Sequence, residues 1–173
     1  MDFLKTLVAS ALLAASLAHA QYSSSALTVG PTRGVSLGSA RVHAGLLIEY
    51  ARYLEHGFEL FGRAPILLTQ VPAGADTPTG KGWVFATGLS LGARYLFAEE
   101  ALRPWVGAHV GTSILVTTPG VSWFVGPGAG AGLEWVLSES FALGARATWD
   151  LFIRLNEPWM SQLGGALTLT ILL

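Results

Sequence analysis

The chain has 173 residues, of which 51% are hydrophobic and only 12% charged, with 21 Gly and no Cys. The formal net charge of −1 provides no basic excess for nucleic acid, and the lack of cysteine excludes a disulfide framework and a cysteine-ligated metal. The length suits one domain, whose stability has to come from backbone pairing and from burial in an apolar phase.

The first twenty residues predict a secretory signal peptide. Lys5 supplies a short basic region, residues 7–17 form an apolar run, and Ala18-His19-Ala20 fits a small-residue cleavage site. The apolar run is shorter than the roughly 20 residues that a membrane-spanning helix needs. We therefore expect residues 1–20 to be removed and residues 21–173 to form a single domain.

From residue 27 onward, apolar and polar residues alternate with a period of two, which is typical of β-strands. Gly38-Ser39 predicts a turn between the first two strands, although an alternative reading fuses residues 33–52 into one strand and leaves an odd strand total. Pro31 and Arg33 both fall on the apolar face of the first strand and make it irregular. The predicted strands cover residues 27–37, 40–52, 58–68, 83–97, 103–116, 123–137, 141–153 and 162–173.

The stretch from Trp123 to Ile153 shows which face of these strands is outside. Its odd positions are apolar, whereas its even positions are mostly glycine with a few charges, and the same parity resumes after the turn at residues 138–140. The outer face of a soluble sheet would carry ordinary polar side chains instead of a row of glycines. We therefore predict that the apolar face contacts lipid and that glycine and charge face a narrow lumen, in an all-β, eight-stranded antiparallel up-and-down transmembrane β-barrel.

The connections between the predicted strands alternate in length. Those near residues 55, 100 and 139 are short, and those near residues 75, 119 and 158 are mostly longer, which predicts short turns and both termini on the periplasmic side of a bacterial outer membrane. The strand parity also predicts two aromatic belts. One comprises Tyr50, Phe58, Tyr95, Phe97, Trp135 and Phe141, and the other comprises Trp83, Phe85 and Trp123.

The inward positions predict a lumen charge network. Four arginines face four acids there, with two histidines besides. The ten residues are Arg41, His43, Glu49, Glu59, Arg63, Arg94, His109, Glu134, Arg146 and Asp150. We expect ion pairs among them to plug the lumen, because an eight-stranded barrel is narrow enough for side chains to fill. The alternative is that this polar column conducts small ions or binds a ligand, although balanced charge forms no selective ring of one sign.

Turn positions predict which of these charges pair. Turns centred at residues 55 and 139 place Glu49 opposite Phe61 and Glu134 opposite Gly144. Diagonal neighbours across the two hairpins would then pair. The predicted pairs are Glu49 with Arg63 and Glu134 with Arg146.

The sequence gives little support for a metal site, a catalytic site or a cofactor site. His43 and His109 lie on different predicted strands without a carboxylate at a ligand-like spacing, so we predict no metal site. No G-x-S-x-G motif occurs, and the glycines from 126 to 132 have a strict spacing of two with no helix after them, unlike a dinucleotide fingerprint. We accordingly predict no catalytic residue and no cofactor.

The pattern of residues 26–173 resembles the small eight-stranded outer-membrane barrels of Gram-negative bacteria, of the OmpA, OmpX and OmpW type. The last strand, which alternates through Leu167, Leu169, Ile171 and Leu173, is similar to the C-terminal signal read by the barrel-assembly machinery, except that an aromatic residue is usual at its end. The resemblance implies a monomer inserted by that machinery and surrounded by outer-membrane lipid and lipopolysaccharide.

The resemblance also implies a range of functions. A structural or surface-interaction role is the leading expectation, and a narrow OmpW-like channel for small or apolar solutes is the alternative. Lipid A deacylases of similar size carry His-x-Ser facing lipid, whereas here His109 is followed by Ser113 and has lumen parity. A soluble lipocalin-like binder would leave the glycine rows exposed to solvent, where glycine weakens a strand.

Overall fold

The computed structural model describes residues 24–37, 41–71, 82–98, 100–117, 120–153 and 159–173. The predicted signal peptide and the Gly38-Ser39 turn lie outside these residues. The nine strands are β1 Ser25–Leu37, β2 Arg41–Tyr53, β3 Phe58–Val71, β4 Gly82–Thr87, β5 Ser90–Leu96, β6 Leu102–Thr117, β7 Gly120–Val136, β8 Phe141–Phe152 and β9 Met160–Leu172. In the described part of the chain, no helix is long and apolar enough to cross a membrane.

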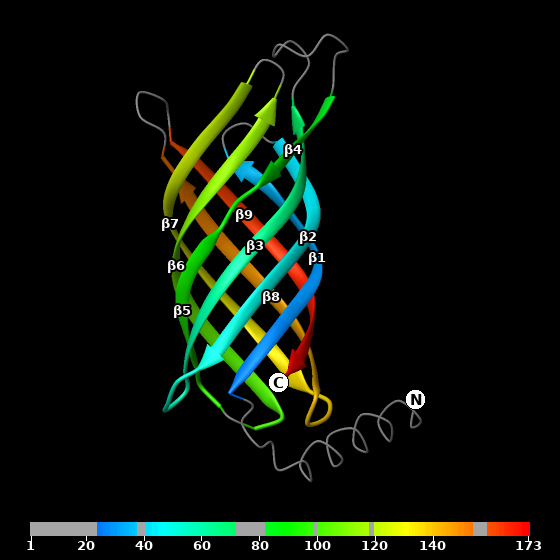
Figure 1. Ribbon diagram of the computed structural model, residues 1–173, viewed down its shortest axis with the longest axis vertical. Coiled ribbons are helices and arrows are strands. Elements are labelled where there is room, and N and C mark those ends of the chain that lie inside the picture. The colour runs from blue at the N-terminus through cyan, green and yellow to red at the C-terminus, as the bar shows by residue number, and fades with distance from the viewer. Residues whose placement is uncertain (1–23, 38–40, 72–81, 99, 118–119, 154–158) are drawn as a thin grey trace.

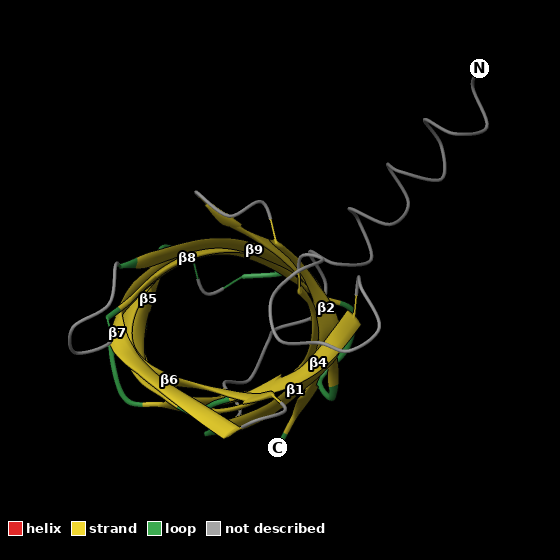
Figure 2. Cartoon of the chain, turned by 90° about the horizontal axis from the view of Figure 1, so that it is seen from above, coloured by secondary structure: helices red, strands yellow, loops and turns green. Residues whose placement is uncertain are grey.

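The strands close into one antiparallel ring, seen along its axis in Figure 2. Each strand has a neighbour on both sides, since β1 pairs with both β2 and β9, and β4 and β5 each pair with β3 and β6. A closed ring satisfies the backbone without a free edge, which is what lipid requires of a sheet. The predicted antiparallel barrel is confirmed, and the fused strand over residues 33–52 is wrong.

Strand pairing around the ring defines the stagger of the barrel. Successive cross-strand partners can be followed once around the ring. They are Ser25, Arg52, Leu60, Ala93, Ala108, Ala129, Trp149, Leu163 and Val35. This path returns to β1 ten residues beyond its start, so the strands are strongly tilted. Figure 1 shows this tilt, with the short turns, the start of β1 and the end of β9 all at the lower end.

The fourth predicted strand, residues 83–97, is interrupted in the structure. β4 ends at Thr87 and β5 begins at Ser90, but both pieces keep the same register with β3 and with β6 and together occupy one place in an eight-membered ring. Pro65 of β3 lies beside the break and has no N–H to donate. Its carbonyl accepts a hydrogen bond from the Thr87 hydroxyl at 2.9 Å. On the β6 side, Thr112 N donates to Leu89 O at 2.8 Å.

The two faces of the wall are inverted relative to a soluble protein, as the parity predicts. Large apolar side chains such as Leu91, Val110 and Leu167 are more than 60% exposed on the outside. The inside holds buried polar groups, including Glu49 and Arg94 at 1% and 2% exposure. The predicted aromatic residues are exposed at both ends of the barrel, and the Phe58 and Tyr95 rings pack 5.0 Å apart at the short-turn end.

The β2–β3 turn fixes a register that differs from the predicted one. His56 and Gly57 both have positive φ, at 51° and 82°, and Leu54 N donates to Phe58 O at 2.8 Å. The hairpin is therefore centred one residue later than predicted. Glu49 lies opposite Arg63, so its predicted placement opposite Phe61 is wrong, whereas Glu134 lies opposite Gly144 as predicted.

Lumen glycines make room for large side chains that cross the barrel. A Cβ on Gly132 of β7 would lie 2.8 Å from the Trp105 indole and 2.7 Å from the Ala145 carbonyl oxygen. Contacts this short force the neighbours to move, and an indole packed in the lumen has little room to do so. The close packing around position 132 therefore leaves room for glycine and not for a larger residue.

We expect Gly132→Val to destabilise the barrel by about 1–3 kcal/mol, because the added side chain overpacks the lumen against Trp105. Urea unfolding of the barrel in lipid vesicles, followed by tryptophan fluorescence, measures the loss. The control is Ala131→Val, one residue earlier on the exposed outer face. Equal effects of the two substitutions would contradict the packing argument.

Candidate functional site: the ion-paired lumen

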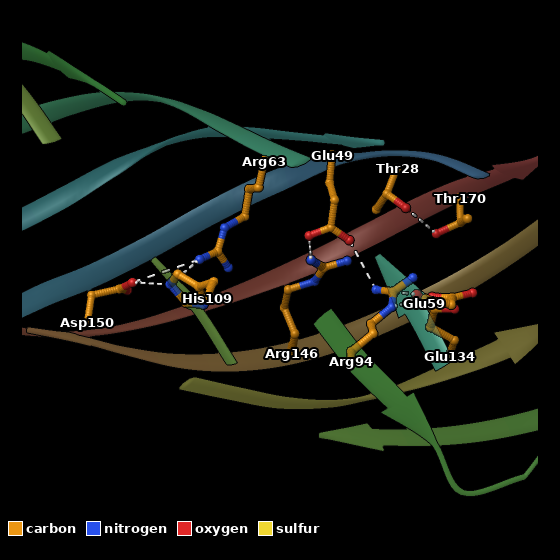
Figure 3. A network of polar contacts seen from close by, with 10 residues as sticks. All are labelled: Thr28, Glu49, Glu59, Arg63, Arg94, His109, Glu134, Arg146, Asp150 and Thr170. Atoms are coloured by element: carbon orange, nitrogen blue, oxygen red, sulfur yellow. Dashed lines mark hydrogen bonds and ion pairs between the residues drawn. The ribbon is translucent and has the colours of Figure 1, made fainter. Parts of the chain in front are cut away.

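All ten predicted lumen residues lie on the inner face of the wall, and the structure joins eight of them into two clusters (Figure 3). The Glu49 cluster, toward the short-turn end, consists of Glu49, Glu59, Arg94, Glu134 and Arg146. The His109 cluster consists of Arg63, His109 and Asp150. Arg41 and His43 form no ion pair with either cluster among the described residues, although His43 lines a cavity together with Arg63 and Asp150.

Arg94 is the centre of the Glu49 cluster. Its Nε donates to Glu59 Oε2, and its Nη1 lies 3.0 Å from Glu49 Oε1 and 3.4 Å from Glu134 Oε1. These three acids come from β3, β2 and β7, so one guanidinium from β5 links four strands through the lumen. Buried charges require partners of this kind because water is not available to solvate them.

Glu49 joins Arg94 to a second arginine. The other oxygen of its carboxylate, Oε2, accepts a hydrogen bond from Arg146 Nη1 at 2.5 Å. Arg146 belongs to β8, which is separated from β2 in the ring by β9 and β1. The Glu49–Arg146 pair therefore crosses the lumen instead of following the wall.

An indole packs against both arginines. The Trp105 ring centroid lies 5.3 Å from Arg94 Cζ and 5.4 Å from Arg146 Cζ, at distances where a cation attracts an aromatic face. Trp105 is 5% exposed and fills the space that the neighbouring lumen glycines leave. It supplies apolar bulk where the charged side chains alone would leave voids.

The His109 cluster lies above the Glu49 cluster. His109 Nε2 is 2.7 Å from Arg63 Nη2 and 2.6 Å from Asp150 Oδ1, and Arg63 Nη2 is 3.8 Å from the same Asp150 oxygen. One ring nitrogen donates to the carboxylate or accepts from the guanidinium, depending on its protonation. The histidine thus has a lumen partner in either form.

The structure pairs the charges differently from the sequence prediction. Glu49 forms its ion pairs with Arg94 and Arg146, and Arg63 forms one with Asp150, so the predicted Glu49–Arg63 ion pair is not formed, although the two residues lie opposite each other and interact electrostatically. Glu134 pairs with Arg94, so the predicted Glu134–Arg146 ion pair is not formed either, although Arg146 occupies the predicted diagonal position. Glu59 pairs with Arg94 on the adjacent strand, whereas the partners of Glu49 and Glu134 come from strands that are not adjacent to theirs.

A buried arginine and a buried tryptophan of the lumen are missing from the predicted set. Arg103 and Trp105 of β6 are 4% and 5% exposed on the same inward parity as His109. Extending the parity of Gly107 and His109 toward the start of the strand would have identified both. With Arg103 included, five arginines and four acids occupy the described part of the lumen.

The pairing between the first and last strands, β1 and β9, is also polar on its inner side. The hydroxyls of Thr28 in β1 and Thr170 in β9 are both fully buried and lie 2.9 Å apart. Each thus satisfies the other where the first and last strands close the ring. Within the described residues, no group of three or more His, Cys, Asp or Glu side chains is arranged to hold a metal ion.

Solved structures of small outer-membrane barrels share this architecture. Neisserial surface protein A superimposes with a TM-score of 0.62 at 12% identity, over 87% of this chain and 98% of its own. Ail, the attachment invasion locus protein of Yersinia pestis, gives 0.53 at 13% identity, over 87% and 99%. The outer membrane enzyme PagL gives 0.53 at 17% identity, over 83% and 98%.

Comparison with protein-family models and with curated protein sequences finds no match. At 12–17% identity, the structural similarity shows the fold, which is that of a small eight-stranded outer-membrane β-barrel. The bacterial outer membrane predicted from the sequence is where these similar barrels are found.

We expect Glu49→Gln to destabilise the barrel by about 3–5 kcal/mol, because it removes one partner of a buried ion pair and leaves the remaining charge uncompensated. Glutamine keeps the side-chain shape, so the change isolates the charge shared by Arg94 and Arg146. The measurement is the urea unfolding midpoint in lipid vesicles. Glu139→Gln, in an exposed turn, is the control and should shift stability by about 0.5 kcal/mol or less. Unfolding of Glu49→Gln at the wild-type midpoint would show that the network does not stabilise the barrel.

Proposed function

We propose that this chain is an integral outer-membrane β-barrel with a lumen plugged by its own side chains and with a structural or surface-interaction role. The observation that carries the proposal is the Glu49 cluster. Its five charged side chains are all at least nine-tenths buried, and they are joined to one another across the barrel. A barrel closed in this way anchors and presents its ends instead of passing solutes.

The charges of the Glu49 cluster support a plug more than a conducting path. Glu49 is 1% exposed with both oxygens bound to arginines, and Trp105 packs against the same two arginines. An ion crossing this level would have to displace paired groups that have no water to replace their partners. We infer that the barrel is closed near its short-turn end.

A surface role is the functional reading that the similar structures favour. One is named a surface protein and another an attachment invasion locus protein, and the latter has also been solved with a heparin analogue. We propose that this barrel likewise acts at the cell surface. We further propose that it is a monomer, inserted by the barrel-assembly machinery and surrounded by outer-membrane lipid and lipopolysaccharide.

A narrow OmpW-like channel is the second candidate, and one observation favours it. Beside the break between β4 and β5, a lumen cavity of about 80 Å³ is lined by Thr87 and Thr112, two residues with outward parity, as well as by His43 and Arg63. Backbone pairing between the strands is therefore interrupted at that point, where hydrogen bonds of side-chain hydroxyls take its place. A solute entering from above could leave sideways there without crossing the Glu49 cluster.

An enzyme acting on lipid is a further role considered from the sequence, and PagL, a similar barrel, is named as an outer membrane enzyme. His109, with Asp150 at 2.6 Å, is directed into the lumen, away from the lipid-facing surface. We propose that this barrel is not an enzyme. Release of fatty acid from lipopolysaccharide by the refolded protein would overturn that proposal.

Planar-bilayer recording of the refolded protein tests the plug. We expect no steady open steps from the wild type. The Glu49→Ala/Arg146→Ala variant should show openings, because it removes both members of a pair that crosses the lumen while Arg94 keeps Glu59 and Glu134 as partners. Glu139→Gln, changed in an exposed turn, should remain closed.

Steady open steps from the wild type would overturn the plug and leave the channel candidate standing. A lateral exit would not produce such steps, so osmotic swelling of barrel-containing vesicles in a small uncharged solute is the complementary assay. Swelling faster than that of protein-free vesicles would favour the side path. Folding of every variant is checked by heat-modifiable migration on a gel.

A further inference from the structure

The end of the lumen opposite the short turns contains a small chamber above both charge clusters. We call it the upper chamber. It has a volume of about 40 Å³ and is lined by Ser36, Arg41, His43, Ser113 and Gln162, together with apolar residues such as Leu67. It adjoins the 80 Å³ cavity, which shares His43, Leu67, Ser113 and Gln162 with it. The Glu49 cluster takes no part in its lining.

Two buried polar atoms of the upper chamber lack a hydrogen-bond partner among the described residues. Ser36 is 1% exposed and its Oγ is unpaired, and Arg41 Nε is buried and unpaired. His43, which is 6% exposed, lines the same chamber. Buried polar groups in native proteins are nearly always paired, so two on one small cavity indicate that something binds between them.

The position of His43 is built into the wall. It lies opposite Gly34 in the β1–β2 pair, and a Cβ on Gly34 would collide with the imidazole. Glycine at this point lets the ring extend across the inner face of β1. The ring therefore lies in space that a side chain at position 34 would occupy.

The charge in this half of the lumen is positive. Glu49, Glu59 and Glu134 are all used in the Glu49 cluster, and Asp150 is bound to His109 and Arg63. Among the described residues that line the 40 Å³ cavity there is no carboxylate, whereas Arg41 is one of them. Arg41 is half-buried in a narrow lumen, where a guanidinium without a carboxylate partner attracts an anion.

We propose that the upper chamber is a binding site for one small monoanion, a halide or a short-chain carboxylate. Arg41 supplies the charge, and His43 and Ser36 donate hydrogen bonds from the two sides of the β1–β2 pair. On this measure a cavity needs about 10–15 Å³ to hold one water, so a chamber of about 40 Å³ has room for a small ion. Water alone satisfies Ser36 but leaves the Arg41 charge unmatched.

The site does not depend on whether the barrel conducts. In a plugged barrel the anion enters from the upper end and leaves the same way, because the Glu49 cluster closes the path below. In a channel the same site would be a step on the path. Binding is therefore measured at equilibrium, separately from conductance.

The test is a two-dimensional amide NMR titration of the full mature chain refolded in detergent micelles. Sodium bromide and sodium formate are the probes, in separate arms that distinguish a halide from a carboxylate, and sodium gluconate, a larger anion, keeps the ionic strength constant. We expect saturable shifts at Ser36, His43, Ser113 and Gln162 with at least one probe. Absence of saturable shifts with both probes would overturn the proposal and leave a water-filled chamber.

Two variants assign the site. Arg41→Gln should weaken binding by about tenfold to a hundredfold, as the loss of a hydrogen bond from a charged donor predicts, and Ser36→Ala should weaken it less. Arg33→Gln is the matched control, because Arg33 is an arginine near the same end of the barrel on its exposed outer face. Unchanged affinity in Arg41→Gln, or equal weakening in Arg33→Gln, would overturn the assignment. Heat-modifiable migration confirms that each variant is folded.

Discussion

The lumen of this barrel depends on one carboxylate that is shared by two arginines. Glu49 holds Arg94 with one oxygen and Arg146 with the other, and those two arginines come from strands on different sides of the ring. The closed sheet gives lipid an apolar surface but leaves ten or so charged groups facing inward, where water is scarce. Their mutual pairing is what allows a narrow barrel to contain them.

Glycine is the complement of those large side chains. A barrel of eight strands has little internal space, so a guanidinium or an indole can cross it only where the facing wall has no side chain. Gly132 provides that space for Trp105, and Gly34 provides it for His43. The glycines that alternate with apolar residues in the sequence therefore mark places where large side chains from other strands fill the lumen.

Local features of this fold could be predicted from the sequence, and features created by ring closure could not. Strand parity identified the inner face and its charged residues because a period of two needs no knowledge of distant strands. The partner of Glu49 could not be identified in that way, since Arg146 lies 97 residues away and meets it only after the ring closes. The break after Thr87 was equally hidden, because the proline beside it, Pro65, belongs to the neighbouring strand.

Ring closure also explains why the two halves of the lumen differ. The staggered pairing places all three lumen glutamates at the level of Arg94 and Arg146, so the lower half is matched in charge and tightly packed. Only Asp150 remains for the His109 cluster, and Arg41 lies above it. A barrel whose inner charges are distributed in this order has its three glutamates paired in the lower half and an excess of arginine in the upper half. The proposed plug and the proposed anion site both depend on this distribution.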